Sequence, residues 1–521
     1  MATRRKRSPL ILIIFLVWFW PATAMADTLR LVYPEAPKTL DPQAWPPDPA
    51  AESVIMTVYG RLIGLKDNQG QLDTTDSLAY TIRVSDDDLM YTVRMREGLT
   101  FSDGKAVNAV AALYTFDRLM ATEAGRNLFP HLKGFNIIGD YTFSLVLNKP
   151  WPPFLASLAL PQASLISPGL GDREKDYLKT RTLGSGRFTV AEAKDSFLAL
   201  ALRSDLVSRP KLDRVEFYFE KDAQKRLELF NKVSGHILAE PPEGPWPSAE
   251  HVPVSLPSWE TLFLAFNLRR PYLGLPGVRE ALALMAKEAY SPAPFKPRGY
   301  FPLGLFSGRV LEEQAFSEDR IKELIYAAGA PRGPLDLVYP GGEAWLRLEA
   351  EKLQAQFSKY GLPVNVIPLT GQAGQGILES GQYDLYLGRR RPEIPSPEMW
   401  LGRFLDSKSA GRGNPAYFAR EAADSLLGEI RASLPRAQRE QKLGELEVLA
   451  ERERPYVFLS QLGVRFLVDR RLAGLKTHPM WPTVWPISLA NLNPFRDTRT
   501  KKTPEPVRVR EFNEQVAEPW E

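Results

Sequence analysis

The sequence predicts an α/β protein built from more than one lobe. Strand patterns alternate with helix patterns of comparable size along most of the 521 residues, which favours parallel sheets with helices on their faces. A chain of this length is expected to divide into two or more lobes, and a hydrophobic content of 44% allows a large core. The 45 Pro are many for a helical bundle and suit an α/β protein with long loops.

The chain begins with an expected strand at 28–33, which runs through a Pro-rich stretch into a helix at about 51–62. The segment 240–254 is rich in Pro and acidic residues, so we expect a linker there, followed by a separate α/β lobe. Further strands are expected at 141–147, 187–191, 214–220, 261–268, 335–339, 363–368 and 383–387, and further helices at 222–233, 278–290, 317–328 and 345–360.

Residues 91–120 are the most informative stretch, because they read as a complete strand, turn and helix. Tyr91, Val93 and Met95 alternate with polar residues, which is the period of a half-buried strand. Gly and Asp residues then supply a turn, and Asn108 is a good N-cap for the helix that follows. The apolar face of this helix is expected to carry Val110, Leu113, Phe116 and Met120.

This stretch resembles the signature of the extracellular solute-binding proteins of family 5, the dipeptide, oligopeptide and nickel receptors of ABC importers. Those proteins usually show a strand, then R-x-G-V-x-F-x-D-G-x-P-x-x-A-x-D-V, then a helix. Residues 96–104 keep the core of that pattern, while 108–110 differ from it mildly. Seven further segments are similar to family elements in the same order: 57–62, 76–79, 84–87, 183–188, 262–282, 317–330 and 381–384.

The resemblance implies a two-lobed periplasmic binding protein fold with an extra inserted domain, as in the three-domain peptide receptors. A hinge between the lobes would let them close over a ligand. The expected division is a signal peptide at 1–26, a discontinuous first lobe at 27–59, 183–259 and 479–499, an inserted second domain at 60–182, a third lobe at 260–478 and a flexible tail at 500–521.

The first 26 residues read as a cleavable secretory signal. A basic cluster at 4–7 precedes an apolar run at 10–20 and then Ala24-Met25-Ala26, so cleavage is expected before Asp27. The apolar run is short for a bilayer span, which needs ~20 residues, and an uncleaved anchor is the alternative. The chain has no Cys, which excludes disulfides and an N-terminal lipid anchor on Cys. A soluble periplasmic protein is therefore expected.

Charge gives no sign of a nucleic-acid partner. The signal holds four of the 66 Lys and Arg, which leaves 62 of them against 62 Asp and Glu. A neutral mature chain lacks the basic surface that nucleic acid requires. We expect a monomer whose partners are a solute and a membrane ABC permease.

No catalytic or metal site is predicted, and no cofactor. Gly184-Ser185-Gly186 lacks the G-x-S-x-G spacing of a nucleophilic Ser, and a tight turn is the better interpretation. The Gly-rich segment 371–376 lacks the Lys-Ser/Thr of a P-loop, so a flexible loop is expected. The Asp triplet at 86–88 falls in an expected hairpin turn. The four His, which show no metal-ligand spacing, are His131, His236, His251 and His478.

Ligands of doubly wound α/β folds bind outside the carboxyl ends of strands, which selects Tyr33 and Pro34 and the segment from 388 onward. In the peptide-binding relatives that segment usually carries a Trp and then an Asp that holds the peptide amino terminus. Here Arg389 stands near the Trp position and Glu393 is the only acid nearby. Trp400, flanked by Met399 and Phe404, is a further candidate for the cleft, with burial in the core as the alternative.

The leading hypothesis is a periplasmic solute-binding protein of an ABC importer that captures a peptide or peptide-like solute, including an anionic one, between two lobes. Arg389, in the cluster with Arg390 and Arg391, is expected to pair with a carboxylate of the solute, with a solvated loop as the alternative. A ligand-sensing or scaffold protein of the same fold that docks to a membrane sensor is the second hypothesis. A secreted hydrolase is the third, and it lacks any nucleophile and base constellation.

Overall fold

A computed structural model of the protein describes residues 27–44, 48–65, 72–73, 77–206, 212–244, 250–297, 299–306, 316–432, 434–470, 472 and 478–480. The predicted signal, the predicted tail from 500 and nearly all of the segment 479–499 lie outside the described residues. Within the described ranges, none of the helices combines the length and the apolar character that crossing a bilayer requires.

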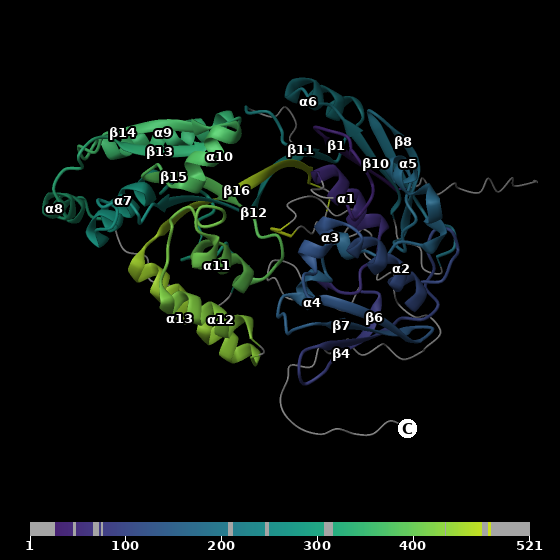
Figure 1. The fold of residues 1–521 in the computed structure, drawn as a ribbon. Helices are drawn as coiled ribbons and strands as arrows, with labels where there is room; N and C mark the ends of the chain where they lie inside the picture. Colours follow the sequence, from purple (N-terminus) through teal and green to yellow (C-terminus); the bar gives the residue numbers. More distant parts are fainter. Residues whose placement is uncertain are drawn as a thin grey trace, which may run out of the picture.

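One mixed sheet of ten strands runs through both lobes (Figure 1). In spatial order its strands are β14 (Val364–Leu369), β13 (Leu335–Pro340), β15 (Leu385–Arg390), β12 (His251–Phe266), β16 (Tyr456–Asp469), β11 (Ile237–Ala239), β1 (Asp27–Tyr33), β10 (Leu212–Phe219), β9 (Phe197–Leu202) and β8 (Phe188–Lys194). The predicted parallel pairing holds for β1 with β10 and β11, and for β13 with β14 and β15. The other neighbours are antiparallel, because they follow hairpins or long returns of the chain rather than crossover helices.

Helices cover both faces of the sheet in the third lobe, on the left of Figure 1. Side chains alternate along β12, so Leu262 and Leu264 enter one core while Phe263 enters the core on the opposite face. The first of these cores is closed by α7 (Pro276–Ala289), α8 (Glu318–Ala328) and α9 (Ala344–Ser358), and the second by α11 (Pro397–Leu405), α12 (Glu421–Arg431) and α13 (Arg436–Glu453). Helix α10 (Gly371–Ser380) packs beside β14 at the sheet edge.

The first lobe has α1 (Pro49–Val58) inside its core, against β1, β8 and β10, and α6 (Ala223–Lys232) on the other face of the sheet. Asp48 caps α1, because its Oδ1 accepts the N–H of Ala51 at 2.7 Å, and Pro49 suits the first helical position. Tyr59 is extended and ends the helix. The helix therefore begins and ends earlier than the predicted 51–62. A short helix, α5 (Glu174–Thr180), also belongs to this part of the chain.

The chain between the two main segments of the first lobe forms a small α/β unit. Its antiparallel sheet has the order β4 (Ala79–Val84), β5 (Met90–Met95), β7 (Thr142–Leu147) and β6 (Leu132–Gly139), and it carries α2 (Ala109–Met120), α3 (Glu123–Leu128) and α4 (Phe154–Ser157). The two-residue strands β2 (Gly64–Leu65) and β3 (Leu72–Asp73) pair with each other, and short 3₁₀ turns lie at η1 (Pro161–Ala163), η2 (Pro168–Arg173) and, in the third lobe, η3 (Ser407–Ser409). We call this unit the inserted domain. Its boundaries at 60 and 182 remain a prediction.

The strand, turn and helix predicted at 91–120 are present, but the apolar face of the helix was assigned incorrectly. Asn108 caps α2 by accepting the N–H of Ala111 at 3.1 Å. Phe116 is buried as expected, yet Val110 is 53% exposed and small residues such as Ala111 are buried instead. The 3₁₀ turns at 161–173 pack against α2.

Two loop predictions were also wrong. The Gly-rich segment 371–376 begins α10 rather than forming a loop. Gly371 has a φ of 56°, which side chains rarely adopt, while a Cβ on Gly374 would lie 2.8 Å from the backbone of Leu369, so Gly371 permits the turn and Gly374 permits close packing at the helix start. The expected linker 240–254 is partly strand, because β12 already begins at His251. The predicted hairpin turn at the Asp triplet is confirmed between β4 and β5.

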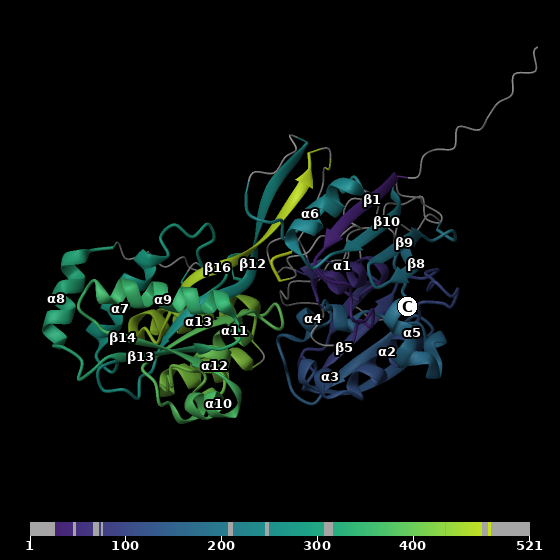
Figure 2. The ribbon, with the colours of Figure 1, turned by 90° about the horizontal axis from the view of Figure 1, so that it is seen from above.

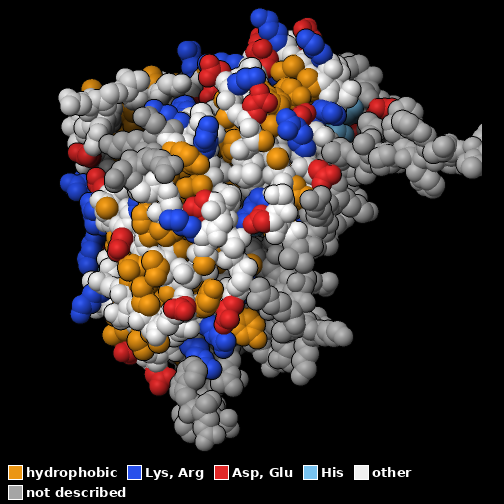
Figure 3. Space-filling view, turned by 90° about the vertical axis from the view of Figure 1, so that its right-hand side faces the viewer, with side chains coloured by type: hydrophobic (Ala, Val, Ile, Leu, Met, Phe, Trp, Pro, Cys, Tyr) orange, Lys and Arg blue, Asp and Glu red, His pale blue; other side chains and the backbone are white. Residues whose placement is uncertain are grey.

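The side of the molecule formed by the first lobe and the inserted domain shows Lys, Arg, Asp, Glu and hydrophobic side chains interspersed with one another (Figure 3). Among the described side chains on this face, neither sign of charge forms a continuous field. A nucleic-acid site would need a basic stripe. The absence of a nucleic-acid partner stays a prediction.

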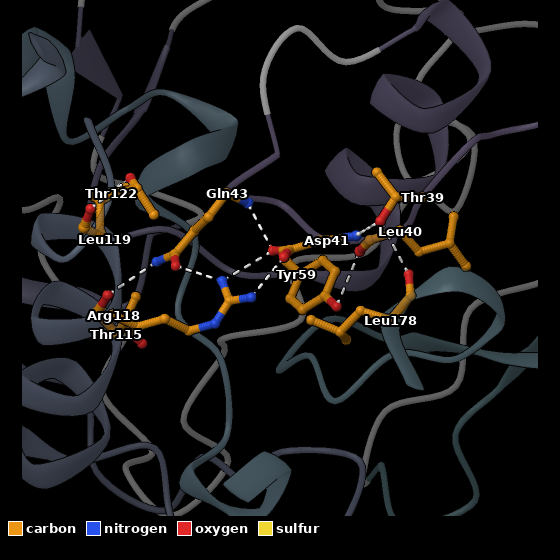
Figure 4. Close-up of polar contacts among 10 residues, drawn as sticks. All are labelled: Thr39, Leu40, Asp41, Gln43, Tyr59, Thr115, Arg118, Leu119, Thr122 and Leu178. Atoms are coloured by element: carbon orange, nitrogen blue, oxygen red, sulfur yellow. Dashed lines mark hydrogen bonds and ion pairs between the residues drawn. The ribbon is translucent and has the colours of Figure 1, made fainter. Parts of the chain in front are cut away.

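A buried ion pair joins the first lobe to the inserted domain (Figure 4). Arg118 of α2 donates to both carboxylate oxygens of Asp41, at 2.6 and 3.1 Å, and also to the side chain of Gln43. Gln43 in turn donates to the carbonyl of Thr115 at 2.9 Å. Because the Arg118 side chain is only 15% exposed, the pair is shielded from solvent. The two units are therefore fixed to each other.

We predict that Arg118→Ala lowers the free energy of unfolding by about 2–3 kcal/mol, because it leaves the Asp41 carboxylate partly buried without its cation. Arg347→Ala is the matched control, since Arg347 makes a single exposed pair with Glu351 on α9. The control should change the free energy of unfolding by no more than about 0.5 kcal/mol. Urea unfolding followed by tryptophan fluorescence measures both values, and equal effects would contradict the prediction.

Candidate functional site

Two long strands, β12 with 16 residues and β16 with 14, connect the lobes (Figure 2). In the first lobe, residues 251–257 pair with 463–469. In the third lobe, residues 261–265 pair with 456–461, and β12 also pairs there with β15. The register shifts at two places, between Leu262 and Phe263 inside the third lobe and, over a longer gap, between Pro257 and Thr261. This longer break is the place where the ribbon can bend without disturbing the pairing inside either lobe, and we call it the hinge.

The hinge is held by buried polar contacts around Trp259. The Trp259 backbone N–H donates to the carbonyl of Pro479 at 2.7 Å, and its indole N–H donates to the carbonyl of Leu303 at 2.9 Å. Gln461 accepts the N–H of Leu303 at 2.9 Å. His478 lies edge-on to the Trp259 ring, and burial lowers the pKa of His478 to about 3, so its imidazole is neutral. The pivot is thus packed and fully built.

A cluster of three charges lies beside the hinge. Arg389, near the end of β15, donates to both carboxylate oxygens of Glu343, at 2.9 and 3.1 Å, and pairs with Glu260. Glu343 immediately precedes α9, and Glu260 belongs to the hinge segment of β12. Two carboxylates therefore surround this one guanidinium, and they hold the strand ends of the third lobe in place.

Arg391, just beyond β15, contacts the other lobe. Its Nη2 lies 3.8 Å from Oε1 of Glu52, in the first turn of α1, and its Nη1 donates to the carbonyl of Met480 at 3.4 Å. Glu52 is only 3% exposed. Burial raises the pKa of Glu52 to about 7, and the positive charge of Arg391 opposes that rise. The result is an ion pair between residues of opposite lobes, next to the hinge.

The structure does not bring the five predicted site residues together. Tyr33 and Trp400 are each only 2% exposed and lie in the cores. The Trp400 indole N–H donates to the carbonyl of Tyr300 at 2.7 Å, and its ring packs against Phe404. Pro34 follows Tyr33 and is half-buried. In this conformation the two aromatic side chains offer almost no surface to a ligand. For Trp400, burial in the core is the alternative that the sequence left open.

The expectation that Arg389 follows a strand end was wrong, because β15 continues to Arg390 and Arg389 pairs with Leu262 of β12. Glu393 is the acid that the sequence places near Arg389 beyond the strand. It pairs instead with Arg403, at 2.9 and 3.0 Å, on the exposed surface. Glu260 and Glu343 take the orienting role, because the sheet places them on either side of β15.

Sequence reasoning missed three acidic residues near the hinge: Glu52, Glu260 and Glu343. A signal existed for Glu52, because it is the one charged residue within the helix 49–58, whose other positions are apolar or small. Nothing in the sequence distinguished Glu260 or Glu343 from surface acids. Their positions depend on strand register and on the packing of α9.

The features considered for catalysis have structural roles. Ser185 accepts the N–H of Gly60 at 3.2 Å, and a Cβ on Gly184 would lie 1.9 Å from the carbonyl oxygen of Val58, so this segment is a packed turn. In the part of the chain that the structure describes, no group of three or more His, Asp or Glu residues is placed to hold a metal ion. Among the described residues around the hinge, charged groups are present and no nucleophile is paired with a base.

Comparison with known proteins gives the family. The sequence model described as "Bacterial extracellular solute-binding proteins, family 5 Middle" matches residues 74–412. The chain belongs to this family. The resemblance found in the sequence is thereby confirmed, and so is the two-lobed α/β fold of its solute-binding proteins.

Relatives and solved structures cover nearly the whole chain. The chain is 24% identical over 506 residues to the probable D,D-dipeptide-binding periplasmic protein DdpA of Escherichia coli (strain K12), with 92% of this chain and 98% of the relative covered. The structure of HbpA2 from Haemophilus parasuis matches with a TM-score of 0.78 at 19% identity, over 88% of this chain and 98% of that one. The unliganded open form of the murein tripeptide-binding protein MppA matches with a TM-score of 0.74 at 18% identity, over 89% and 97%. These relatives are binding proteins rather than enzymes.

We predict that Glu52→Gln stabilises the protein at pH 8 and leaves its stability unchanged at pH 4. In the unfolded chain Glu52 ionises above its ordinary pKa of 4.5, whereas in the folded chain it ionises only near 7, so folding stability is lost as pH rises between these values. That difference in pKa corresponds to at most about 3 kcal/mol.

Thermal unfolding at the two pH values measures this gain. Glu440→Gln, which removes an exposed carboxylate of α13, is the control and should shift neither melting temperature by more than a degree or two. A Glu52→Gln variant that is less stable than the natural protein at pH 8 would show that the ionised pair with Arg391 stabilises the fold.

Proposed function

We propose that this protein is the periplasmic receptor of an ABC importer and binds a peptide or peptide-like solute between its lobes. The observation that carries the proposal is the ribbon of β12 and β16, which crosses from the first lobe to the third and whose register shifts between Pro257 and Thr261 and again between Leu262 and Phe263. Such a hinge permits rigid lobes to close around a solute. Relatives described as binding dipeptides and tripeptides support the class of solute.

The charges near the hinge suit the ends of a short peptide. Main-chain groups of an extended peptide can pair with strand edges, and its charged ends need fixed counter-charges. Arg389 is already matched by two carboxylates, so we assign it a positioning role rather than the predicted contact with solute. Arg391, which is half-buried and makes a longer contact with Glu52, is the better candidate for an anionic group of the solute.

The division of the chain stays a proposal that the hinge supports. The expected boundary between 259 and 260 falls inside β12, within the register break at 257–261. A boundary at this place lets each lobe keep its own paired strands. No observation favours the sensing or scaffold role over import.

We propose, further, that the mature protein begins at Asp27 and carries no lipid. The basic cluster, short apolar run and Ala24-Met25-Ala26 support cleavage there. Mass spectrometry of the protein from the periplasmic fraction should give the mass of 27–521. An uncleaved mass, found in the membrane fraction, would instead support an anchored protein.

Solute binding should compact the protein and raise its melting temperature. Native mass spectrometry of protein purified from its own periplasm identifies the co-purified solute. Small-angle scattering should then show a smaller radius of gyration with this solute than without it. At a solute concentration of 100 times Kd, mass action adds about 2.7 kcal/mol to the free energy of unfolding. Proven binding with an unchanged radius would support a rigid scaffold instead.

A further inference from the structure

The ten-stranded sheet ends in the first lobe at β8, on the side away from β12 and β16 (Figure 2). Among the described residues β8 pairs only with β9, so its other edge has no strand beside it. At the opposite end of the sheet, β14 contains Pro368, which cannot donate to a neighbouring strand. β8 contains no Pro, and a register shift leaves Ala191 without a partner on β9. The outer edge of β8 therefore presents backbone groups to which another strand can pair.

A groove of about 580 Å³ follows this open edge. It is lined by residues 189–193 of β8, by Tyr177 and 180–183 at and after the end of α5, and by residues 102–103 of the inserted domain. Side chains of a strand alternate between its two faces, so five consecutive residues line one groove only where the groove runs along the strand edge. The groove thus has the shape that an extended chain requires.

The groove carries more negative than positive charge. Its lining includes the carboxylates of Asp103 and Glu192 and one guanidinium, that of Arg181. Glu192 lies 2.5 Å from the ammonium group of Lys194 on the same strand. Asp103 accepts a hydrogen bond from the hydroxyl of Ser167 at 2.7 Å and forms no ion pair with any described residue. An extended chain with basic side chains would complement this charge.

The floor of the groove also suits a peptide chain. Tyr177 and Leu183 contribute apolar surface to the lining. Thr182 is only 4% exposed, and its Oγ1 is buried with no hydrogen-bond partner within the described ranges. Buried hydroxyls are normally hydrogen-bonded, so a polar group from an occupant of the groove would satisfy this one.

A segment near the end of this chain has the matching pattern. Val507 and Val509 alternate with Arg508 and Arg510, which is the period of a strand with one apolar and one basic face. The last described residue, Met480, lies beside the hinge, and residues 481–505 can span up to about 80 Å when extended. β8 is five strand spacings from β16, about 24 Å, so the segment can reach it.

We propose that residues 506–510 pair with the open edge of β8 and add an eleventh strand to the sheet. The valines contact the apolar part of the groove, and the arginines pair with Asp103 and Glu192. The occupant belongs to the same chain, because a tethered segment has a far higher effective concentration at the groove than a separate peptide. Only this part of the predicted flexible tail is held, and the covered edge cannot pair with a second molecule.

Hydrogen–deuterium exchange of the purified protein with its intact tail tests the pairing. Amides of residues 189–193 that face away from β9 should exchange slowly in the natural protein. Val507→Pro and Val509→Pro each remove an N–H donor from the segment, so both should accelerate this exchange by about tenfold. Val516→Pro, which changes the tail outside the segment, is the matched control and should leave the exchange unchanged.

An engineered disulfide tests the same contact by proximity. The natural chain has no Cys, so an introduced pair has no competing thiol. Ala191→Cys is combined with Arg508→Cys or with Val509→Cys, which samples both faces of the segment. One combination should form a disulfide within the molecule under mild oxidation. The control, Ala191→Cys combined with Val516→Cys, should not.

Three outcomes overturn the inference. Rapid exchange along β8 in the natural protein would mean that the groove is empty. Slow exchange that persists in both Pro variants would mean that a different segment covers the edge. A disulfide that links two molecules, seen as a dimer on a non-reducing gel, would mean that the tail pairs with a second copy. Circular dichroism confirms that each variant is folded, and none of these outcomes bears on solute binding between the lobes.

Discussion

The pairing of β12 with β16 is the interaction on which the rest of the structure depends. These two strands are the only neighbours in the ten-stranded sheet, as described, that cross together from one lobe to the other. Their alternating side chains supply the cores of both lobes: Val457 and Phe458 enter opposite faces in the third lobe, while Phe466 enters the first. Without this ribbon the lobes would share no backbone hydrogen bonds in the sheet, and the register break that permits bending would not exist.

The same ribbon explains why charged residues gather in one place. Strand β15 lies beside β12, so its last residues reach the hinge, and Arg389 and Arg391 follow from that register. Arg389 is neutralised within its own lobe, which makes it part of the frame. Arg391 extends to the other lobe and meets a carboxylate that burial makes reluctant to ionise. A buried carboxylate that lacks full hydrogen bonding costs free energy, so this position is unfavourable for Glu52.

The inserted domain enlarges the first lobe without weakening it. Arg118 and Asp41 provide a shielded ion pair at the junction, and Gln43 extends it to the backbone of α2. Rigid attachment matters for a hinged receptor, because closure moves one body against another only if each body is stiff.

The sequence by itself determined the family and most of the local structure. The strand, turn and capped helix around Asn108 depend on residues within one turn of each other, so their pattern is legible in the chain. Only the tertiary structure decided that Val110 is exposed, that Trp400 lies in the core and that Arg389 belongs to a strand, because sheet extension and packing set these outcomes. The pairing of Glu52 with Arg391 also required the fold. The two residues are far apart in the sequence and on different lobes, and no local pattern records which distant charge a buried carboxylate will meet.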